Sequence, residues 1–489
     1  MEHKTANFGK DFIVYAVGAA SQMVLSFILL PILTKLFNPT EYGLIDISTT
    51  IIQIVSIVFG FGMTTAVSFY YYFHNDEHEK KQTVTTGLLF LLVINILTVF
   101  LLSINATSLG AAIYKSPAYT NIFKITIFVA GLSVLQNFLF HLLRISRRAS
   151  LYVVASLLKG GLQVGIIILF VISFGLGLRG YFYGYLSTVF LSLLIIFSIT
   201  KKYLTFSFSK KRLIELLKYG VPLIPAGISL WALQLVDRFF LIHYATLADV
   251  GLYGVGVRST ILLVLLISSL QLAWGPFAFS IMKQDDAKKV YTEIFSLFVI
   301  IATWLIILTT YFAKEAITLV TTPEYTQAYV VTPFLSFGTF FLGAYTLLSI
   351  GINLVNKMHI ITTTTIIAAI LNIILNFILI PRYGILGAAI STASSYLVST
   401  MLVYFFSQKY YPIDYKMKKN MTIVLISVGY LIGYFTITVE GTIINLIIRA
   451  LICLSFPVVL YTLKLLTPNQ VKSIINTIKS LTVKTNPSN

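Results

Sequence analysis

Long apolar runs recur along almost the whole chain, and they restrict its fold more than any other feature. A run of about 18 or more apolar residues can cross about 30 Å of hydrocarbon as a helix. Only 11% of the 489 residues are charged, against roughly 25% in an ordinary soluble domain. The runs are too long and continuous for barrel strands, and a lipid-exposed segment must satisfy its own backbone. The sequence therefore predicts an all-α polytopic membrane protein and excludes a soluble enzyme, a secreted disulfide scaffold and a disordered chain.

The apolar runs predict fourteen transmembrane helices. Each helix is expected where a run is bounded by polar or helix-breaking residues. The expected ranges are 11–33, 43–68, 83–104, 120–143, 149–172, 179–199, 217–240, 249–272, 290–312, 328–351, 359–380, 384–406, 421–439 and 443–465.

The basic residues are unevenly distributed among the loops between these helices. Most of the 35 Lys and Arg residues fall at the termini and in the even-numbered loops, above all in residues 200–218 and 407–420. Because Lys and Arg are retained on the cytoplasmic side, we expect a multi-pass protein of the bacterial cytoplasmic (inner) membrane with both termini in the cytoplasm. The net charge of +18 has the same explanation, so we expect no nucleic-acid partner.

Two short matches indicate an internal repeat. Residues 38–44 resemble residues 247–252, and residues 177–180 resemble residues 384–387 at nearly the same separation. They predict two six-helix lobes related by a parallel pseudo-two-fold repeat, with two helices appended; chance recurrence of helix-end chemistry is the alternative. The expected divisions are an N-lobe (1–199), a cytoplasmic basic linker (200–216), a C-lobe (217–406), and the last two helices with a cytoplasmic tail (407–489).

Several motifs resemble those of a known transporter family. They are Pro39–Leu44, Asp237–Leu241, Asp249–Tyr253, Arg258, Pro323–Tyr325, Asn372, Asn376 and Ile380–Ala389. With these residues, the chain resembles the polysaccharide (lipid-linked oligosaccharide repeat-unit) flippases of the multidrug/oligosaccharidyl-lipid/polysaccharide exporter superfamily. The resemblance is specific for the family and not for the cargo. It implies a two-lobed bundle that turns over an isoprenoid-pyrophosphate-linked sugar repeat unit.

Two cations inside predicted spans are the main candidates for binding the cargo. Lys159 and Arg258 each lie about nine or ten residues into a helix, which at 1.5 Å per residue is near the middle of the membrane. A charge there costs several kcal/mol unless it is paired or faces water. We expect both to bind the substrate pyrophosphate, for which the arginine fork is well suited. The alternatives are that Lys159 snorkels, or that either residue pairs internally, for instance with Asp46.

Three arginines end the helix at 120–143 on the predicted cytoplasmic side. They are Arg144, Arg147 and Arg148. Positive-inside topology explains them, and capture of an incoming lipid pyrophosphate from the cytoplasm is the functional alternative.

Another group of residues is predicted to serve as a gate or ion pair. Asp237 and Arg238 lie near the outer end of the helix at 217–240, and Asp46 is the third candidate member. Neighbours on a helix diverge by about 100°, so we expect Asp237 and Arg238 to have separate partners.

Three prolines are predicted hinges. Pro222 and Pro225 must bend or loosen the start of the helix at 217–240, and Pro31 does the same late in the first helix. We expect the helices to move at these prolines because proline weakens the helix there.

These features predict a transporter and not an enzyme. The expected function is translocation of polyprenyl-pyrophosphate-linked oligosaccharide repeat units by alternating access, for surface polysaccharide (exopolysaccharide or O-antigen) biosynthesis. The expected partners are this glycan substrate, the lipid bilayer and the polysaccharide polymerase machinery, with the protein itself a monomer. The nearest alternative is a multidrug or organic-ion antiporter, which would need acidic cavity residues. A membrane-embedded glycosyltransferase or polymerase is disfavoured because few acids and no large loop lie on the outer side.

No cofactor or metal is predicted. The single cysteine, Cys453, lies in an apolar run, and His74 and His78 lie in a mixed-charge loop that we interpret as solvated. The chain has no Walker lysine motif, and the sequence leaves Na⁺ coupling, H⁺ coupling and the substrate gradient as sources of energy.

Overall fold

Helices make up all of the regular structure in the described part of the chain. The computed structural model describes residues 28–146, 148–436 and 442–466. Within these residues, 11 helices are long and apolar enough to cross a membrane. The predicted all-α polytopic membrane fold is confirmed at this level.

The described chain packs into two compact units. The first consists of the described residues up to Arg258, with Thr318–Thr326 and Thr365–Ser391; the second consists of Ser259–Ile317, Gln327–Thr364 and the described residues from Thr392 onward. The lobe boundaries expected from the sequence stay a prediction.

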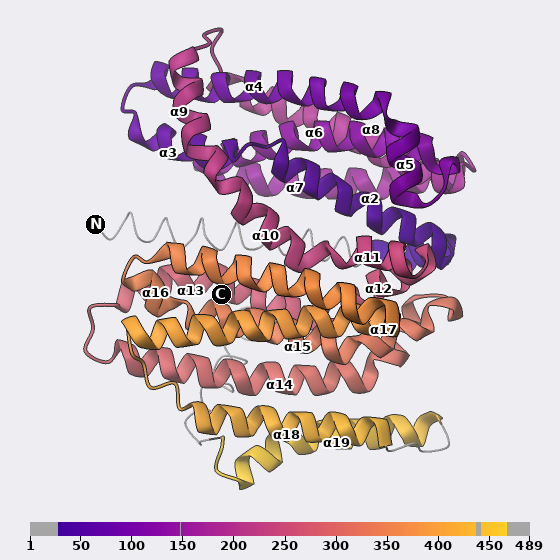
Figure 1. Ribbon diagram of the computed structural model, residues 1–489, viewed down its shortest axis with the longest axis vertical. Coiled ribbons are helices and arrows are strands. Elements are labelled where there is room, and N and C mark those ends of the chain that lie inside the picture. Colours follow the sequence, from indigo (N-terminus) through magenta and orange to yellow (C-terminus); the bar gives the residue numbers. More distant parts are fainter. Residues whose placement is uncertain (1–27, 147, 437–441, 467–489) are drawn as a thin grey trace, which may run out of the picture. The chain divides into compact units, whose positions relative to one another are not determined.

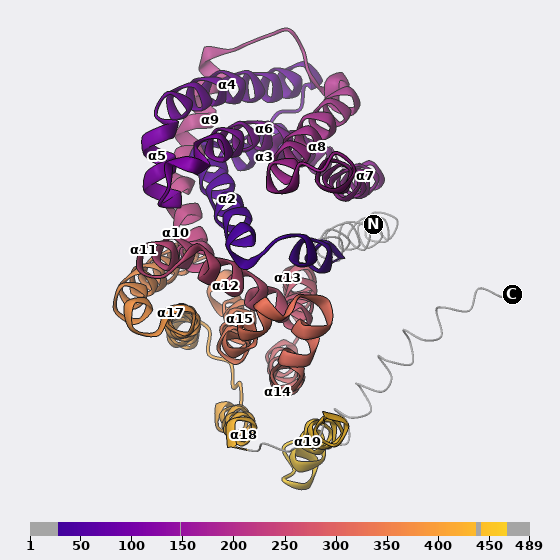
Figure 2. The same cartoon turned by 90° about the vertical axis from the view of Figure 1, so that its right-hand side faces the viewer.

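The first unit is a bundle of long helices that run side by side (Figure 1). The bounds are α2 (Pro39–Val58), α3 (Met63–Phe73), α4 (Glu77–Ile104), α5 (Ala106–Tyr114), α6 (Thr120–Ile145), α7 (Ala149–Ile168), α8 (Gly177–Thr200), α9 (Lys210–Gly220), α10 (Ile224–Leu235), α11 (Asp237–Tyr244) and α12 (Leu247–Ser259). Helix α6 packs against α2, α4 and α8, and α7 packs against α8, as the end-on view of Figure 2 shows. Helix α6 is thus the centre of this bundle.

Helices α9 and α10 cross the bundle obliquely (Figure 1). Helix α9 packs against α3 and α4, whereas α10 packs against α2. A 3₁₀ turn at Val221–Leu223 separates the two helices; it contains Pro222, and Pro225 follows in the first turn of α10. Proline lacks an N–H and cannot continue a regular helix from within, so the predicted break is present in the backbone.

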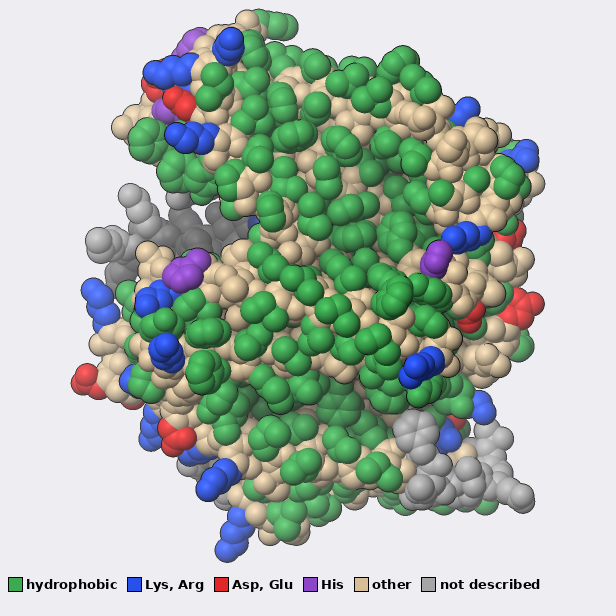
Figure 3. Space-filling model, viewed as in Figure 1, with side chains coloured by type: hydrophobic (Ala, Val, Ile, Leu, Met, Phe, Trp, Pro, Cys, Tyr) green, Lys and Arg blue, Asp and Glu red, His purple; other side chains and the backbone are tan. Residues whose placement is uncertain are grey.

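Apolar and charged side chains of the first unit are distributed as expected for a protein in lipid. Val67, Leu91 and Phe138 belong to one buried apolar cluster, whereas Ile96 and Phe100 on α4 are exposed. On the face shown in Figure 3, apolar side chains cover the middle of the helices. Charged side chains gather where α3 ends and α4 and α9 begin. This distribution fits an apolar belt with a polar rim.

The second unit has its own apolar core. Its helices are α13 (Ile261–Ile281), α14 (Ala287–Val320), α15 (Thr332–Leu348), α16 (Ile350–Leu354), both ends of α17 (Met358–Tyr410), α18 (Met417–Thr436) and α19 (Thr442–Thr462). Helix α14 holds the last two helices: Trp304 Nε1 donates to the Cys453 carbonyl at 2.9 Å, and the Tyr311 hydroxyl donates to the Tyr430 carbonyl at 2.8 Å. Between α18 and α19, the rings of Tyr430 and Phe456 meet edge to face.

Two backbone breaks show how glycines divide the apolar runs. The predicted helix 43–68 is interrupted between α2 and α3, where Phe61 and Gly62 have φ of 50° and 60°. Conversely, α17 runs through both predicted helices 359–380 and 384–406, with a kink at Gly384 (φ 53°, ψ −128°). Left-handed backbone is readily adopted by glycine, so this kink lies at the predicted boundary.

Candidate functional site

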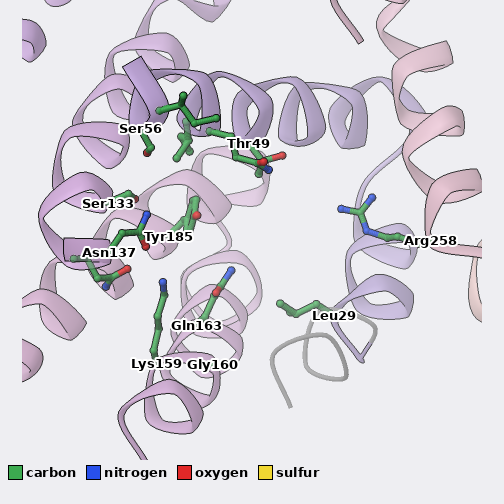
Figure 4. Close-up of a pocket in the computed structure, with 14 residues that line it drawn as sticks. Leu29, Thr49, Ser56, Ser133, Asn137, Lys159, Gly160, Gln163, Tyr185 and Arg258 are labelled. Atoms are coloured by element: carbon green, nitrogen blue, oxygen red, sulfur yellow. The ribbon is translucent and has the colours of Figure 1, made fainter. Parts of the chain in front are cut away.

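A cavity of about 650 Å³ lies within the first unit. It is lined by Leu29, Thr49, Ile52, Gln53, Ser56, Ile57, Ser133, Gln136, Asn137, Lys159, Gly160, Gln163, Tyr185 and Arg258. Figure 4 shows Lys159 and Gln163 extending into this space from one helix, with Thr49, Asn137 and Tyr185 around it and Arg258 on another side. We call this space the polar cavity.

Helical spacing explains why these polar side chains share one cavity. Thr49, Gln53 and Ser56 on α2 are four and three residues apart, and Lys159 and Gln163 on α7 are four apart. Residues three or four apart lie on the same face of a helix. Each of these helices therefore presents one polar stripe in an otherwise apolar sequence, and the stripes line the polar cavity.

The cavity lining is cationic. Its charged members among the described residues are Lys159 and Arg258, and no described Asp or Glu belongs to the lining. Lys159 has no ion pair or hydrogen bond among the described residues, and its ammonium lies 5.6 Å from the centre of the Phe140 ring. A cation over an aromatic face gains only modest stabilisation. The charge of Lys159 is thus left without an anionic partner.

Arg258, by contrast, belongs to a four-residue ion cluster with Asp46, Asp237 and Arg238. Asp46 accepts from both arginines: Oδ2 lies 3.1 Å from Arg238 Nε, and Oδ1 lies 3.3 Å from an Arg258 guanidinium nitrogen. Arg238 also pairs with Asp237 at 2.7 Å, and the Tyr253 hydroxyl donates to Asp237 at 2.6 Å. Two acids and two arginines make the cluster neutral.

Burial separates Arg258 from the rest of the cluster. Side-chain exposure is 6% for Asp46, 2% for Asp237 and 5% for Arg238, but 33% for Arg258. Arg258 is therefore the member of the ion cluster that faces the polar cavity, while the other three are enclosed by the helices.

Close helix crossing holds this cluster in place. A Cβ atom on Gly43 of α2 would collide with the Leu247 carbonyl oxygen, and one on Gly251 of α12 would collide with the Pro39 carbonyl oxygen. Only glycine permits such an approach of two backbones. The contact brings Asp46 and Arg258 within reach of each other across the two helices.

The residues predicted from the sequence to serve as a gate or ion pair lie together in this ion cluster. Asp237 and Arg238 have separate partners, Tyr253 and Asp46, as expected, and they also pair with each other. The long arginine side chain turns back along its helix, where its guanidinium also donates to the Gln234 carbonyl at 2.8 Å. Length and flexibility of the side chain thus override the divergence of neighbouring Cβ directions.

Arg144 and Arg148, two of the three arginines predicted to capture the cargo, do not belong to the polar cavity lining. Arg144 is exposed near the end of α6, and Arg148, also exposed, donates from Nε to the Tyr203 hydroxyl at 3.3 Å. Arg147 lies outside the described residues. Of the predicted hinges, Pro222 and Pro225 lie at the break between α9 and α10, and Pro31 lies in a helical stretch at 28–36.

Neutral polar residues of the cavity were not among the sequence candidates. Gln53, Gln136, Asn137 and Gln163 all line it. The signal that could have found them is the spacing of polar residues at three and four positions within apolar spans, which marks a shared inward face.

Comparison with known proteins agrees with the class that fold and cavity define, a multi-pass membrane protein with a polar intramembrane cavity. A family model described as polysaccharide biosynthesis protein matches residues 32–330. The chain belongs to this family, which confirms the family predicted from the sequence motifs.

Two related proteins match part of the chain. It is 27% identical over 281 residues to an uncharacterized membrane protein of Methanocaldococcus jannaschii, covering 55% of each chain. It is 29% identical over 140 residues to a probable low-salt glycan biosynthesis flippase of Haloferax volcanii, covering 28% of this chain and 30% of that protein. The match thus spans about half, or less, of the length of these relatives.

Several solved structures share the fold. The lipid II flippase MurJ in an inward closed conformation matches with a TM-score of 0.72 and 16% identity, over 92% of this chain and 99% of that one. An inward-facing multidrug resistance MATE family transporter of the MOP superfamily matches with a TM-score of 0.65 and 15% identity, over 81% and 97%.

Proposed function

We propose that this protein translocates polyprenyl-pyrophosphate-linked oligosaccharide repeat units across the cytoplasmic membrane by alternating access, for surface polysaccharide biosynthesis. The observation that carries the proposal is the polar cavity, whose described lining contains Lys159 and Arg258 and no acid. An anionic, hydroxyl-rich cargo matches this lining, because amides and hydroxyls bond sugars while the two cations attract a diphosphate. The polyprenyl tail would stay in lipid.

The two cations have different tasks in this proposal. Lys159 has no anionic partner in the part of the chain that the structure describes, so a diphosphate would neutralise a charge that is costly within the membrane. Arg258 would exchange Asp46 for a phosphate oxygen, to which its planar fork can donate two bonds. Asp46 would keep Arg238, so the exchange strands no carboxylate.

The antiporter alternative has support from the fold that the chain shares with a multidrug transporter. A cationic drug, however, would meet two cations and no carboxylate in the described lining of the polar cavity. The similar proteins include two flippases, which favours transport over glycosyl transfer. Whether Na⁺, H⁺ or the substrate gradient supplies the energy is left open in the proposal.

We also propose fourteen spans in two six-helix lobes related by a parallel repeat, with two appended helices. The kinked helix α17 is long enough for two spans, with its kink at Gly384, and α18 and the helical stretch at 28–36 add to the 11 long helices. These additional helices support the proposed count of fourteen spans. The protein is proposed to work as a monomer beside the polymerase machinery.

The proposed orientation puts both termini and the linker in the cytoplasm, and it can be tested by labelling. In a Cys453→Ala background, Lys211→Cys should react with a membrane-impermeant maleimide only after permeabilisation, because most basic residues lie on its side of the membrane. Lys115→Cys, also exposed and on the opposite side, is the matched control and should react in intact cells. Labelling of Lys211→Cys from outside would reverse the orientation.

Loss of the protein should leave lipid-linked repeat units accumulating on the cytoplasmic leaflet and should reduce surface polysaccharide. The pyrophosphate and glycan are too polar to cross hydrocarbon unaided. Extraction of lipid-linked glycans and quantification of surface glycan in a deletion strain would measure both, with a complemented strain as the control. Normal surface glycan together with new drug sensitivity would instead support the antiporter.

A further inference from the structure

A second cavity, of about 730 Å³, lies in the second unit where α17 is followed by α18. It is lined by Tyr404, Gln408, Pro412, Ile413, Asp414, Tyr415, Lys416, Met417, Lys418 and Lys419. We call it the lysine cavity. It shares no residue with the polar cavity.

Positive charge at the lysine cavity is not balanced locally. Lys416 and Lys418 are exposed and Lys419 is half-buried, and none of them makes an ion pair with a described residue. The single acid of the lining is Asp414, whose carboxylate accepts the Lys416 backbone N–H at 3.1 Å. Three lysines and one acid thus line one cavity.

The loop that carries these lysines is held by its own hydrogen bonds. Gln408 donates to the Ile413 carbonyl at 2.6 Å and accepts from its N–H at 3.2 Å. The Thr292 hydroxyl donates to the Asp414 carbonyl at 2.7 Å, and Asn420 donates to the Tyr415 carbonyl at 2.7 Å. A basic segment held in this way is pre-organised, which lowers the entropic cost of ligand binding.

Two further features point to an anion as the ligand. The cavity lies at the start of α18, whose N-terminal end carries partial positive charge. Tyr415 lines the cavity, is 1% exposed, and has a hydroxyl with no hydrogen-bond partner among the described residues. The lysine cavity therefore offers ammonium groups, a helix N-terminus and one unused hydroxyl.

We propose that the lysine cavity binds the phosphodiester headgroup of an anionic membrane lipid. Lysines beside the end of an apolar helix attract anionic headgroups at the membrane surface. The apolar surface of α18, on which Met421 and Leu425 are exposed, continues from the cavity and suits the acyl chains. The site is independent of cargo binding, because the polar cavity lies in the other unit.

Native mass spectrometry of the purified full-length protein tests this site with phosphatidylglycerol as the probe and phosphatidylcholine as the neutral comparison. The variant Lys416→Gln/Lys418→Gln/Lys419→Gln should bind phosphatidylglycerol on the order of 100-fold more weakly, from the loss of three lysines near an anionic group. The matched control, Lys201→Gln/Lys202→Gln/Lys211→Gln, removes the same charge from another exposed basic segment and should bind normally. Arginine at positions 416, 418 and 419 should also preserve binding.

Three results would overturn the proposal. Equal affinity of the glutamine variant and its control for phosphatidylglycerol would show that these lysines do not bind the lipid. Equal binding of phosphatidylcholine would show that the headgroup charge does not determine binding. If inorganic phosphate alone bound with the affinity of the lipid, the ligand of the lysine cavity would be free phosphate and not a lipid headgroup. None of these results would affect flipping of the cargo, so failure here is distinguishable from failure of the proposed function.

Discussion

Replacing Arg258 with alanine is expected to reduce transport of lipid-linked repeat units on the order of 10- to 100-fold, the loss expected for one charge-assisted hydrogen bond. Folding should survive, because Asp46 keeps its 3.1 Å contact with Arg238 and one charge is removed from the membrane interior. Arg258→Lys should recover only part of the activity, since an ammonium cannot reproduce the two-pronged guanidinium. Lipid-linked glycan that accumulates in a complemented deletion strain measures the effect.

The matched control for this experiment is Arg179→Ala, which removes an exposed arginine at the start of α8 and should leave transport unchanged. Full transport activity of Arg258→Ala would show that Arg258 does not bind the cargo. If Arg258→Ala instead misfolds and Asp46→Asn rescues it, then the pair with Asp46 is structural and the exchange proposed for Arg258 is wrong.

Replacing Arg238 with alanine should affect stability far more than replacing Arg258. Arg238 is the partner that Asp46 and Asp237 share, and all three side chains are buried. Breaking a buried ion pair from one side costs about 3–5 kcal/mol, so Arg238→Ala should give low expression and a lowered unfolding temperature in detergent. Thermal unfolding followed by size-exclusion chromatography measures this change.

A second substitution makes that prediction specific. Asp237→Asn in the Arg238→Ala background removes the stranded carboxylate while keeping a group that the Tyr253 hydroxyl can donate to. Stability should recover most of the way towards the wild-type value. An Arg238→Ala protein as stable as wild type would show that water reaches the carboxylates, and the ion cluster would then have no structural role.

Much of the fold could be predicted because lipid imposes simple limits on length and polarity. The helix expected at 83–104 lies within α4, which begins earlier, at Glu77, because Asp76 caps it ahead of the apolar run. Hydropathy does not register such polar first turns. It also missed the break before Gly62, since a left-handed residue leaves apolar content unchanged.

The candidate site was predictable only where it carries charge. Lys159 and Arg258 stood out because ionised groups are rare within spans, and the structure places both on the polar cavity. The neutral lining residues Gln53 and Gln163 cost too little in lipid to stand out by composition. The sequence left pairing of Arg258 with Asp46 as one alternative, and only the close approach of α2 and α12 shows that the two residues meet.

The neutrality of the ion cluster has a consequence for how voltage would act on the carrier. Movement of a neutral group across the membrane does no electrical work, whereas a unit charge gains or loses about 2.3 kcal/mol per 100 mV. Because the ion cluster is neutral, the net charge of the empty polar cavity is the positive charge of Lys159. A bound diphosphate carries more negative charge than one lysine can balance, so the loaded cavity has the opposite sign. Under the proposed function, an inside-negative potential would pull the empty carrier inward and push the loaded carrier outward, which favours export in both halves of the cycle.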